Sequence, residues 1–263
     1  KDNADWLAMA DTPLAVVHAD PRVGDITGRI ESLASATNGF LAGGLTASRS
    51  RFAQLAGDVK EGVVSGVMLS LHQVPVQLGL TQGCSPIGPT RRITGSKENI
   101  LTTIDDRPAL EVLKEDIGEV LARDLRRIGG YIFAALPVLG SDTADYLVRN
   151  LTGIDQETGA IAIGEMVETG DPIMFCRRDP DTAVEDLKRM LKDLKRRTGD
   201  GTIKGGLYFS CVARGPNQFG PDSAELSTIR DELGEFPLAG LFANGEISND
   251  RLYGYTGVLA LFL

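Results

Sequence analysis

The stretch ENILTTIDDRPALEVLKEDIGEVLARDLRRIGG, residues 98–130, contains both patterns that decide the fold class. Its first seven residues are typical of a β-strand, whereas later apolar residues recur at intervals of three and four, as on one face of a helix. The helical stripe consists of Leu110, Leu113, Ile117, Leu121, Leu125 and Ile128. We expect Asp105 or Asp106 to cap this helix and Gly129 to end it.

Outward from this stretch, the same two patterns predict further helices and many short strands. Helical periodicity occurs over residues 179–199, over about 222–234 and over a shorter segment near 26–33. The strand-like runs are LAVVHA, GVVSGVMLSL, VPVQLGL, YIFAALPV, GAIAIGEMV, IMFC, GLYFSCVA and YTGVLALFL. Many of the 31 glycines separate these runs, which indicates frequent turns. The predicted fold is therefore α+β, with mixed or antiparallel β-sheets flanked by α-helices.

A change in pattern near Ile104 predicts two associated domains. A glycine-punctuated, strand-rich part ends there and the longest predicted helix follows, so we place the domains at residues 1–104 and 105–263. The sequence starts at Lys1, inside a segment that looks like a helix or linker. We therefore expect residues upstream of it.

Charge and hydropathy exclude several classes of partner. The formal net charge of −9 repels a phosphate backbone, which makes nucleic acids and acidic membrane surfaces poor partners. The longest apolar runs are too short to span a bilayer, and no signal segment opens the chain. The expectation is a soluble protein in the cytoplasm.

Residue types that usually carry catalysis or metal binding are scarce. The cysteines Cys84, Cys176 and Cys211 have no Cys-x-x-Cys spacing, which argues against a disulfide framework or a zinc site. His18 and His72 are the two histidines, too few for a multi-histidine metal site. The glycine-rich GFLAGG lacks the lysine and hydroxyl residue of a phosphate-binding loop, and we expect a tight turn into a strand there. No metal or cofactor is predicted.

The segment QGCSPIGPTRR, residues 82–92, is the first candidate for a binding element. Its glycines and prolines make a stiff loop without helical periodicity, and it carries Cys84 and Arg91. The alternative is a structural crossover in which Cys84 is simply buried.

A second candidate element combines two strand ends. Cys211 and Arg214 follow one strand, and Asn244 and Glu246 lie in a predicted turn after LAGLFA. An arginine can grip a carboxylate and a glutamate can receive an ammonium group, so this set suits a zwitterionic ligand. An internal ion pair between Arg214 and Glu246 is the structural alternative. We expect these residues to share one pocket with the 84–92 loop.

Several motifs together resemble the FIST family of proteins. GCSPIGP, DDRPALEVL, CVARG, GLFANGEI and YGYTGVLALF occur in the order seen in that family, and HADP and FLAGGLTAS precede them. By this resemblance, residues 1–104 are similar to the C-terminal portion of a FIST N-domain and residues 105–263 to a FIST C-domain.

The resemblance implies a sensory module that binds small ligands, with amino acids as the proposed ligands and a signalling output protein as the partner. A histidine commonly precedes the Gly-Tyr-Thr-Gly run in the family, where this sequence has Tyr253. Haem binding, known from one branch of the family, is therefore unexpected, and His18 and His72 are the remaining candidates for an axial ligand.

Two other functions remain open at the level of sequence. An enzyme would use Cys84 or Cys211 as nucleophile, with Arg91, Arg92 or Arg214 stabilising a thiolate. A ligand-free interaction scaffold is the other alternative. We expect a binding module and not an enzyme.

Overall fold

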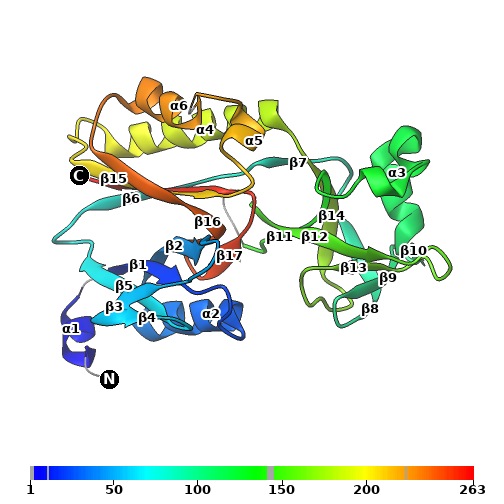
Figure 1. The fold of residues 1–263 in the computed structure, drawn as a ribbon, viewed down its shortest axis with the longest axis horizontal. Coiled ribbons are helices and arrows are strands. Elements are labelled where there is room, and N and C mark those ends of the chain that lie inside the picture. Colours follow the sequence, from blue (N-terminus) through cyan, green and yellow to red (C-terminus); the bar gives the residue numbers. More distant parts are fainter. Residues whose placement is uncertain (1–2, 11, 141–144, 223) are drawn as a thin grey trace. The chain divides into compact units, whose positions relative to one another are not determined.

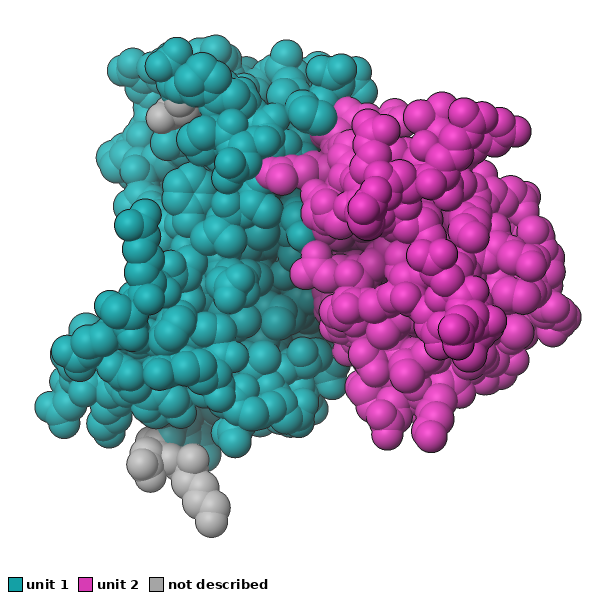
Figure 2. Space-filling model, turned by 45° about the vertical axis from the view of Figure 1, so that its right-hand side comes forward, with its two compact units in different colours: residues 1–83, 180–263 teal, residues 84–179 magenta. Residues whose placement is uncertain are grey.

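The computed structural model describes residues 3–10, 12–140, 145–222 and 224–263. The chain folds into two compact units (Figures 1 and 2). Unit 1 contains residues 1–83 and 180–263, and unit 2 contains residues 84–179. Both units combine sheets with helices, and the predicted α+β fold with mixed and antiparallel sheets is confirmed. The predicted boundary at residue 104 lies within unit 2.

Unit 1 is built on one mixed sheet. Strands follow the order β5-β1-β2-β16-β15-β18-β6, with β17 beside β16. The β1–β2 and β15–β16 pairs are parallel, and the other pairs in this sheet are antiparallel. Its strands are β1 Pro13–Ala19, β2 Phe40–Thr46, β5 Val64–Ser70, β6 Val76–Thr81, β15 Gly205–Cys211, β16 Leu238–Ser248, β17 Arg251–Tyr253 and β18 Gly257–Phe262. A small hairpin, β3 Gln54–Ala56 with β4 Asp58–Lys60, belongs to the same unit.

Helices cover this sheet at both ends of the strand order (Figure 1). The helices of unit 1 are α1 Ala4–Met9, α2 Ile26–Thr37, α4 Pro180–Thr198, α5 Pro216–Phe219 and α6 Ala224–Leu233. Ile30 of α2 packs on β1 and β2, while Leu187 and Leu191 of α4 pack with Tyr208 and Leu259. Three of these helices, α2, α4 and α6, are the ones that periodicity predicts.

Unit 2 is an antiparallel sheet with one helix against it. The strands are β7 Cys84–Pro86, β8 Arg91–Lys97, β9 Ile100–Ile104, β10 Arg107–Pro108, β11 Ile132–Pro137, β12 Tyr146–Ile154, β13 Ile161–Ile163 and β14 Pro172–Arg178. Helix α3, Ala109–Ala122, is followed by a 3₁₀ turn at Leu125–Arg127. Leu113 is buried against the sheet, with Ile117 and Leu121 partly buried beside it, so the predicted inward stripe is confirmed.

Three local predictions are wrong in this structure. Helix α3 ends at Ala122 and not at Gly129. Asp105 and Asp106 do not cap α3, because both have positive φ angles and form the two-residue turn between β9 and β10. The N-cap position belongs to Pro108. The expected turn at Asn244–Ile247 is instead part of β16, which stays paired to β2 with a register shift between Ala243 and Glu246.

Candidate functional site

Arg214 lies in the turn that follows β15 and is completely buried. Its amide donates to the carbonyl of Cys211 at 2.8 Å, and its guanidinium lies 4.8 Å from the ring centroid of Phe219. Nε of Arg214 donates to Oε1 of Glu225 at 2.9 Å. A buried arginine is tolerated because a carboxylate meets it there.

Glu225, in the first turn of α6, gathers hydrogen bonds from several elements. The Tyr208 hydroxyl donates to its Oε1 at 2.6 Å, and Ser210 Oγ donates to its Oε2 at 3.1 Å. Together with Arg214, these donors connect β15, the turn after it and α6. Sequence reasoning missed Glu225, whose one signal is an acidic residue at the start of a predicted helix.

Glu246 is buried in β16, beyond the register shift that starts at Ala243. Its Oε2 accepts hydrogen bonds from Thr256, at 2.7 Å from Oγ1 and 3.2 Å from the amide nitrogen. Burial raises the pKa of Glu246 to about 8, although Thr256, the Arg214 guanidinium and the Cys211 thiol act in the opposite direction. Near neutral pH, this carboxyl group is therefore mainly protonated.

The four predicted residues in unit 1 differ in their surroundings. The internal ion pair of Arg214 is made with Glu225 and not with Glu246, the partner considered from sequence. Cys211 is buried, and burial followed by the charge of Glu246 raises the pKa of its thiol to about 12. Asn244 is exposed at the strand bulge.

The other two predicted residues lie in unit 2. Cys84 is buried, and Tyr146 OH donates to its carbonyl at 2.6 Å. Arg91 is bound to carboxylates of its own unit, with Nη2 at 2.7 Å from Oδ1 of Asp116. The segment around them is partly regular, since Cys84 begins β7 and Arg91 begins β8. Convergence of this segment with the residues of unit 1 stays a prediction.

Two neighbouring side chains of unit 1 each have a buried polar atom without a hydrogen-bond partner among the described residues. These atoms are Oε1 of Glu246 and Oγ1 of Thr81. Thr81 ends β6 and pairs with Gly257, next to the Thr256 that binds Glu246. Buried polar groups are normally satisfied, so these two atoms mark this part of unit 1 as a candidate site.

The histidines do not form a metal centre. The His18 ring lies 5.7 Å from the Phe209 ring, and burial lowers the pKa of His18. Across residues 3–10, 12–140, 145–222 and 224–263, no group of three or more His, Cys, Asp or Glu side chains is arranged to hold a metal. Tyr253, which stands where the resemblance suggests a histidine, is buried and pairs with Glu246 across β16 and β17.

Comparison with known proteins places this arrangement in a family. The FIST N domain model matches residues 3–107, and the FIST C domain model matches residues 109–249. The chain belongs to the FIST family. FIST domains are generally regarded as sensory, ligand-binding modules, which agrees with the resemblance seen in the motifs.

The chain is similar to curated proteins from mycobacteria and from a plant. The uncharacterized protein Rv0628c of Mycobacterium tuberculosis is 36% identical over 236 residues, covering 86% of this chain and 60% of the relative. The uncharacterized protein Mb0898c of Mycobacterium bovis is 34% identical over 236 residues, covering 86% of this chain and 59% of the relative. The F-box/LRR-repeat protein At5g63520 of Arabidopsis thaliana is 29% identical over 118 residues, 44% of this chain and 20% of that protein. The chain thus spans about 60% of the length of its mycobacterial relatives.

No described helix of this FIST chain is long and apolar enough to cross a membrane.

Proposed function

We propose that this FIST chain is a cytoplasmic sensory module that binds an amino acid or a related small metabolite through the buried polar groups of unit 1. The observation that carries the proposal is the buried carboxyl group of Glu246, whose Oε1 has no hydrogen-bond partner among the described residues, in the same unit as the buried guanidinium of Arg214. Arg214 follows β15, and Glu246 lies in β16. A ligand with an amine and a carboxylate offers the complementary groups.

The protonation of Glu246 gives this proposal a specific consequence. With a pKa of about 8, the carboxyl group carries a proton at pH 7 in the free protein. A bound ammonium group favours the charged carboxylate, so binding of an amine ligand displaces that proton. Ligand binding at pH 7 should therefore release close to one proton per site.

The three thiols support a binding module over a cysteine enzyme. Cys84, Cys176 and Cys211 are all buried. Burial raises the pKa of Cys211 to about 12, whereas a nucleophilic thiol needs a pKa near or below neutral pH. The ligand signal would then pass to a separate output protein, such as a kinase or cyclase.

Calorimetric titration with the common amino acids and their amine and carboxylate analogues tests the proposal. Repeating each titration in buffers of different ionisation enthalpy counts the protons released. We expect Glu246→Gln to abolish the release and to weaken binding by about 1.5–3 kcal/mol. Glu235→Gln, a change at an exposed position of the same unit, is the control and should preserve both.

Two results would contradict the proposal. One is the absence of binding by any member of the panel to the wild-type protein. The other is binding whose affinity and proton release are the same in wild type and Glu246→Gln.

A further inference from the structure

The first half of β16 has an open edge. Leu238–Phe242 pairs with β15 on one side, in parallel register from Gly206 to Ser210. On the other side, β2 reaches only as far as the pair of Thr46 with Ala243. No residue in the described part of the chain pairs with Leu238–Phe242 on that side, so its outward amide and carbonyl groups are free to bond another strand.

This open edge is apolar and exposed. Leu241 is 40% exposed and Phe242 is 51% exposed, and Ala239 and Gly240 are exposed as well. Native proteins usually protect such an edge with a charged residue, a proline or a bulge. LAGLF contains none of these, since the register with β15 is continuous throughout. An unprotected apolar edge of this kind is typical of a strand that pairs with a further strand.

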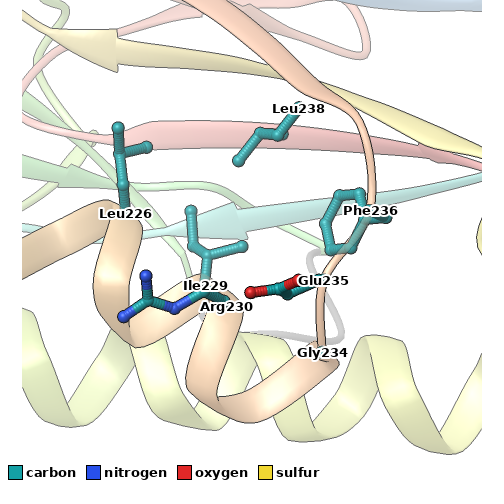
Figure 3. A pocket seen from close by; sticks show the side chains of 7 residues that line it. All are labelled: Leu226, Ile229, Arg230, Gly234, Glu235, Phe236 and Leu238. Carbon is teal, nitrogen blue, oxygen red and sulfur yellow. The ribbon is translucent and has the colours of Figure 1, made fainter.

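A groove adjoins the start of this edge (Figure 3). It has a volume of about 440 Å³ and lies between α6 and the first residues of β16. Its apolar walls are Leu226, Ile229, Phe236 and Leu238, and Arg230, Gly234 and Glu235 complete the lining. Leu226 is 48% exposed, so this apolar wall is open to an incoming side chain.

We propose that two copies of this chain pair through their β16 edges, antiparallel and centred on Gly240. In this register Leu238 lies opposite the partner's Phe242, and Ala239 lies opposite the partner's Leu241. Side chains at alternate positions of a strand point to the same face, so Phe242 shares the face of Leu238. The partner's Phe242 thus enters the groove that Leu238 lines.

Three features favour a second copy over a different protein. The run is self-complementary, because reversing LAGLF places an apolar or glycine residue opposite each residue. No like charges oppose each other at this strand pair, although the chain carries a net charge of −9. A two-fold axis also uses the edge and the groove of both copies at once, which closes the assembly at a dimer.

Sedimentation velocity of the full chain over a micromolar to hundred-micromolar range tests this dimer. We expect a reversible monomer–dimer equilibrium in the wild-type protein. Phe242→Lys should raise the dissociation constant by at least about 100-fold, because two symmetry-related aromatic anchors are lost. Leu226→Lys, on the groove wall, should weaken the dimer in the same direction. Circular dichroism should show that both variants, at exposed positions, keep their fold.

Strand β5, at one edge of the same sheet, provides the matched control. Val67 of β5 is 55% exposed, and Val67→Lys should leave the dimer unchanged. A wild-type protein that stays monomeric over the whole range overturns the proposal, and the edge would then suit a strand from another protein. A dimer that survives Phe242→Lys, or that is lost in Val67→Lys alone, overturns it as well.

Discussion

Arg214 and Glu225 form a buried ion pair, in which Nη2 lies 2.8 Å from Oε1 and both side chains are at most 6% exposed. Arg214→Met leaves the carboxylate of Glu225 without its charged partner. We expect the free energy of unfolding to fall by about 3–5 kcal/mol, since breaking a buried pair leaves an uncompensated charge. Urea denaturation at pH 7 measures this loss.

A surface arginine in the same unit is the control. The Arg230 side chain is 58% exposed and lies 3.6 Å from Asp231, so Arg230→Met should change stability by less than about 1 kcal/mol. The double variant Arg214→Met, Glu225→Leu should lose less stability than the sum of its single changes. Equal effects of Arg214→Met and Arg230→Met would show that the buried pair has no special role.

Glu246 should give the protein a pH-dependent stability near neutrality. Its folded pKa of about 8 lies above the ordinary value of 4.5, so the folded state binds the proton more tightly. The stabilisation is therefore complete below about pH 4.5 and is lost as the pH rises through about 8. The full loss is on the order of 5 kcal/mol.

Glu246→Gln removes the titrating group while keeping its size. We expect this variant to show a flatter profile of unfolding free energy between pH 5 and 9, and to be more stable than wild type at the alkaline end. Exposed Glu235→Gln should follow the wild-type profile. Parallel profiles for wild type and Glu246→Gln would rule out the raised pKa.

Asp20, from the HADP motif, connects two loops of unit 1. Its carboxylate accepts from the amide, Nε and Nη2 of Arg22 and from the amide of Gly62. The hydrogen bonds from the Arg22 side chain hold the pKa of Asp20 well below its usual range. The stability that this group contributes is present above its ordinary pKa and is lost as the pH falls further.

Asp20→Asn should accordingly lower the melting temperature at pH 7, with a smaller effect at pH 3. Thermal melts at both pH values test this, and Asp58→Asn, at an exposed position of β4, is the control. An Asp20→Asn variant that melts with the wild type at pH 7 would argue against the link between the loops.

Local sequence patterns predict elements whose burial is regular. The stripe of α4 is an example, because Leu187, Leu191 and Leu194 are all fully buried. Strand β2 has a weaker sequence signal because it contains paired glycines. A Cβ at Gly43 would lie 1.8 Å from the Val17 carbonyl oxygen, so close approach to β1 requires glycine there and weakens the strand signal.

Long-range pairing limits what the sequence can predict of domains and sites. In unit 1, β6 pairs with β18 and β2 pairs with β16. All the residues of unit 2 lie between the two strands of each pair in the sequence. A local change of composition near residue 104 contains no information about such pairs. Arg214 and Glu246 were identified because polar residues at strand ends are unusual, whereas Glu225 resembled an ordinary acid in the first turn of a helix.

The thiols give a final prediction, which bears on the enzyme alternative. Contact with the Cys84 thiol, followed by burial, raises the pKa of Cys176, and burial raises the pKa of Cys211 to about 12. Neither thiol forms appreciable thiolate at pH 8 in the folded state, and Cys84 is buried too. We expect slow modification of all three by a disulfide reagent until the protein is unfolded in guanidinium, when three thiols should react at once.

Cysteine-to-serine variants assign any reaction that does occur. Fast stoichiometric labelling of the native protein that disappears in Cys211→Ser or Cys84→Ser would reveal an activated thiol and favour a cysteine enzyme. The alternative result is labelling at the rate of global unfolding, with the same rate per remaining thiol in the wild type and in both variants. That result fits a binding module in which the cysteines only pack in the core. Because a buried thiol can react only when the structure opens, raising the urea concentration below the unfolding transition should then accelerate the labelling in proportion to the population of open molecules.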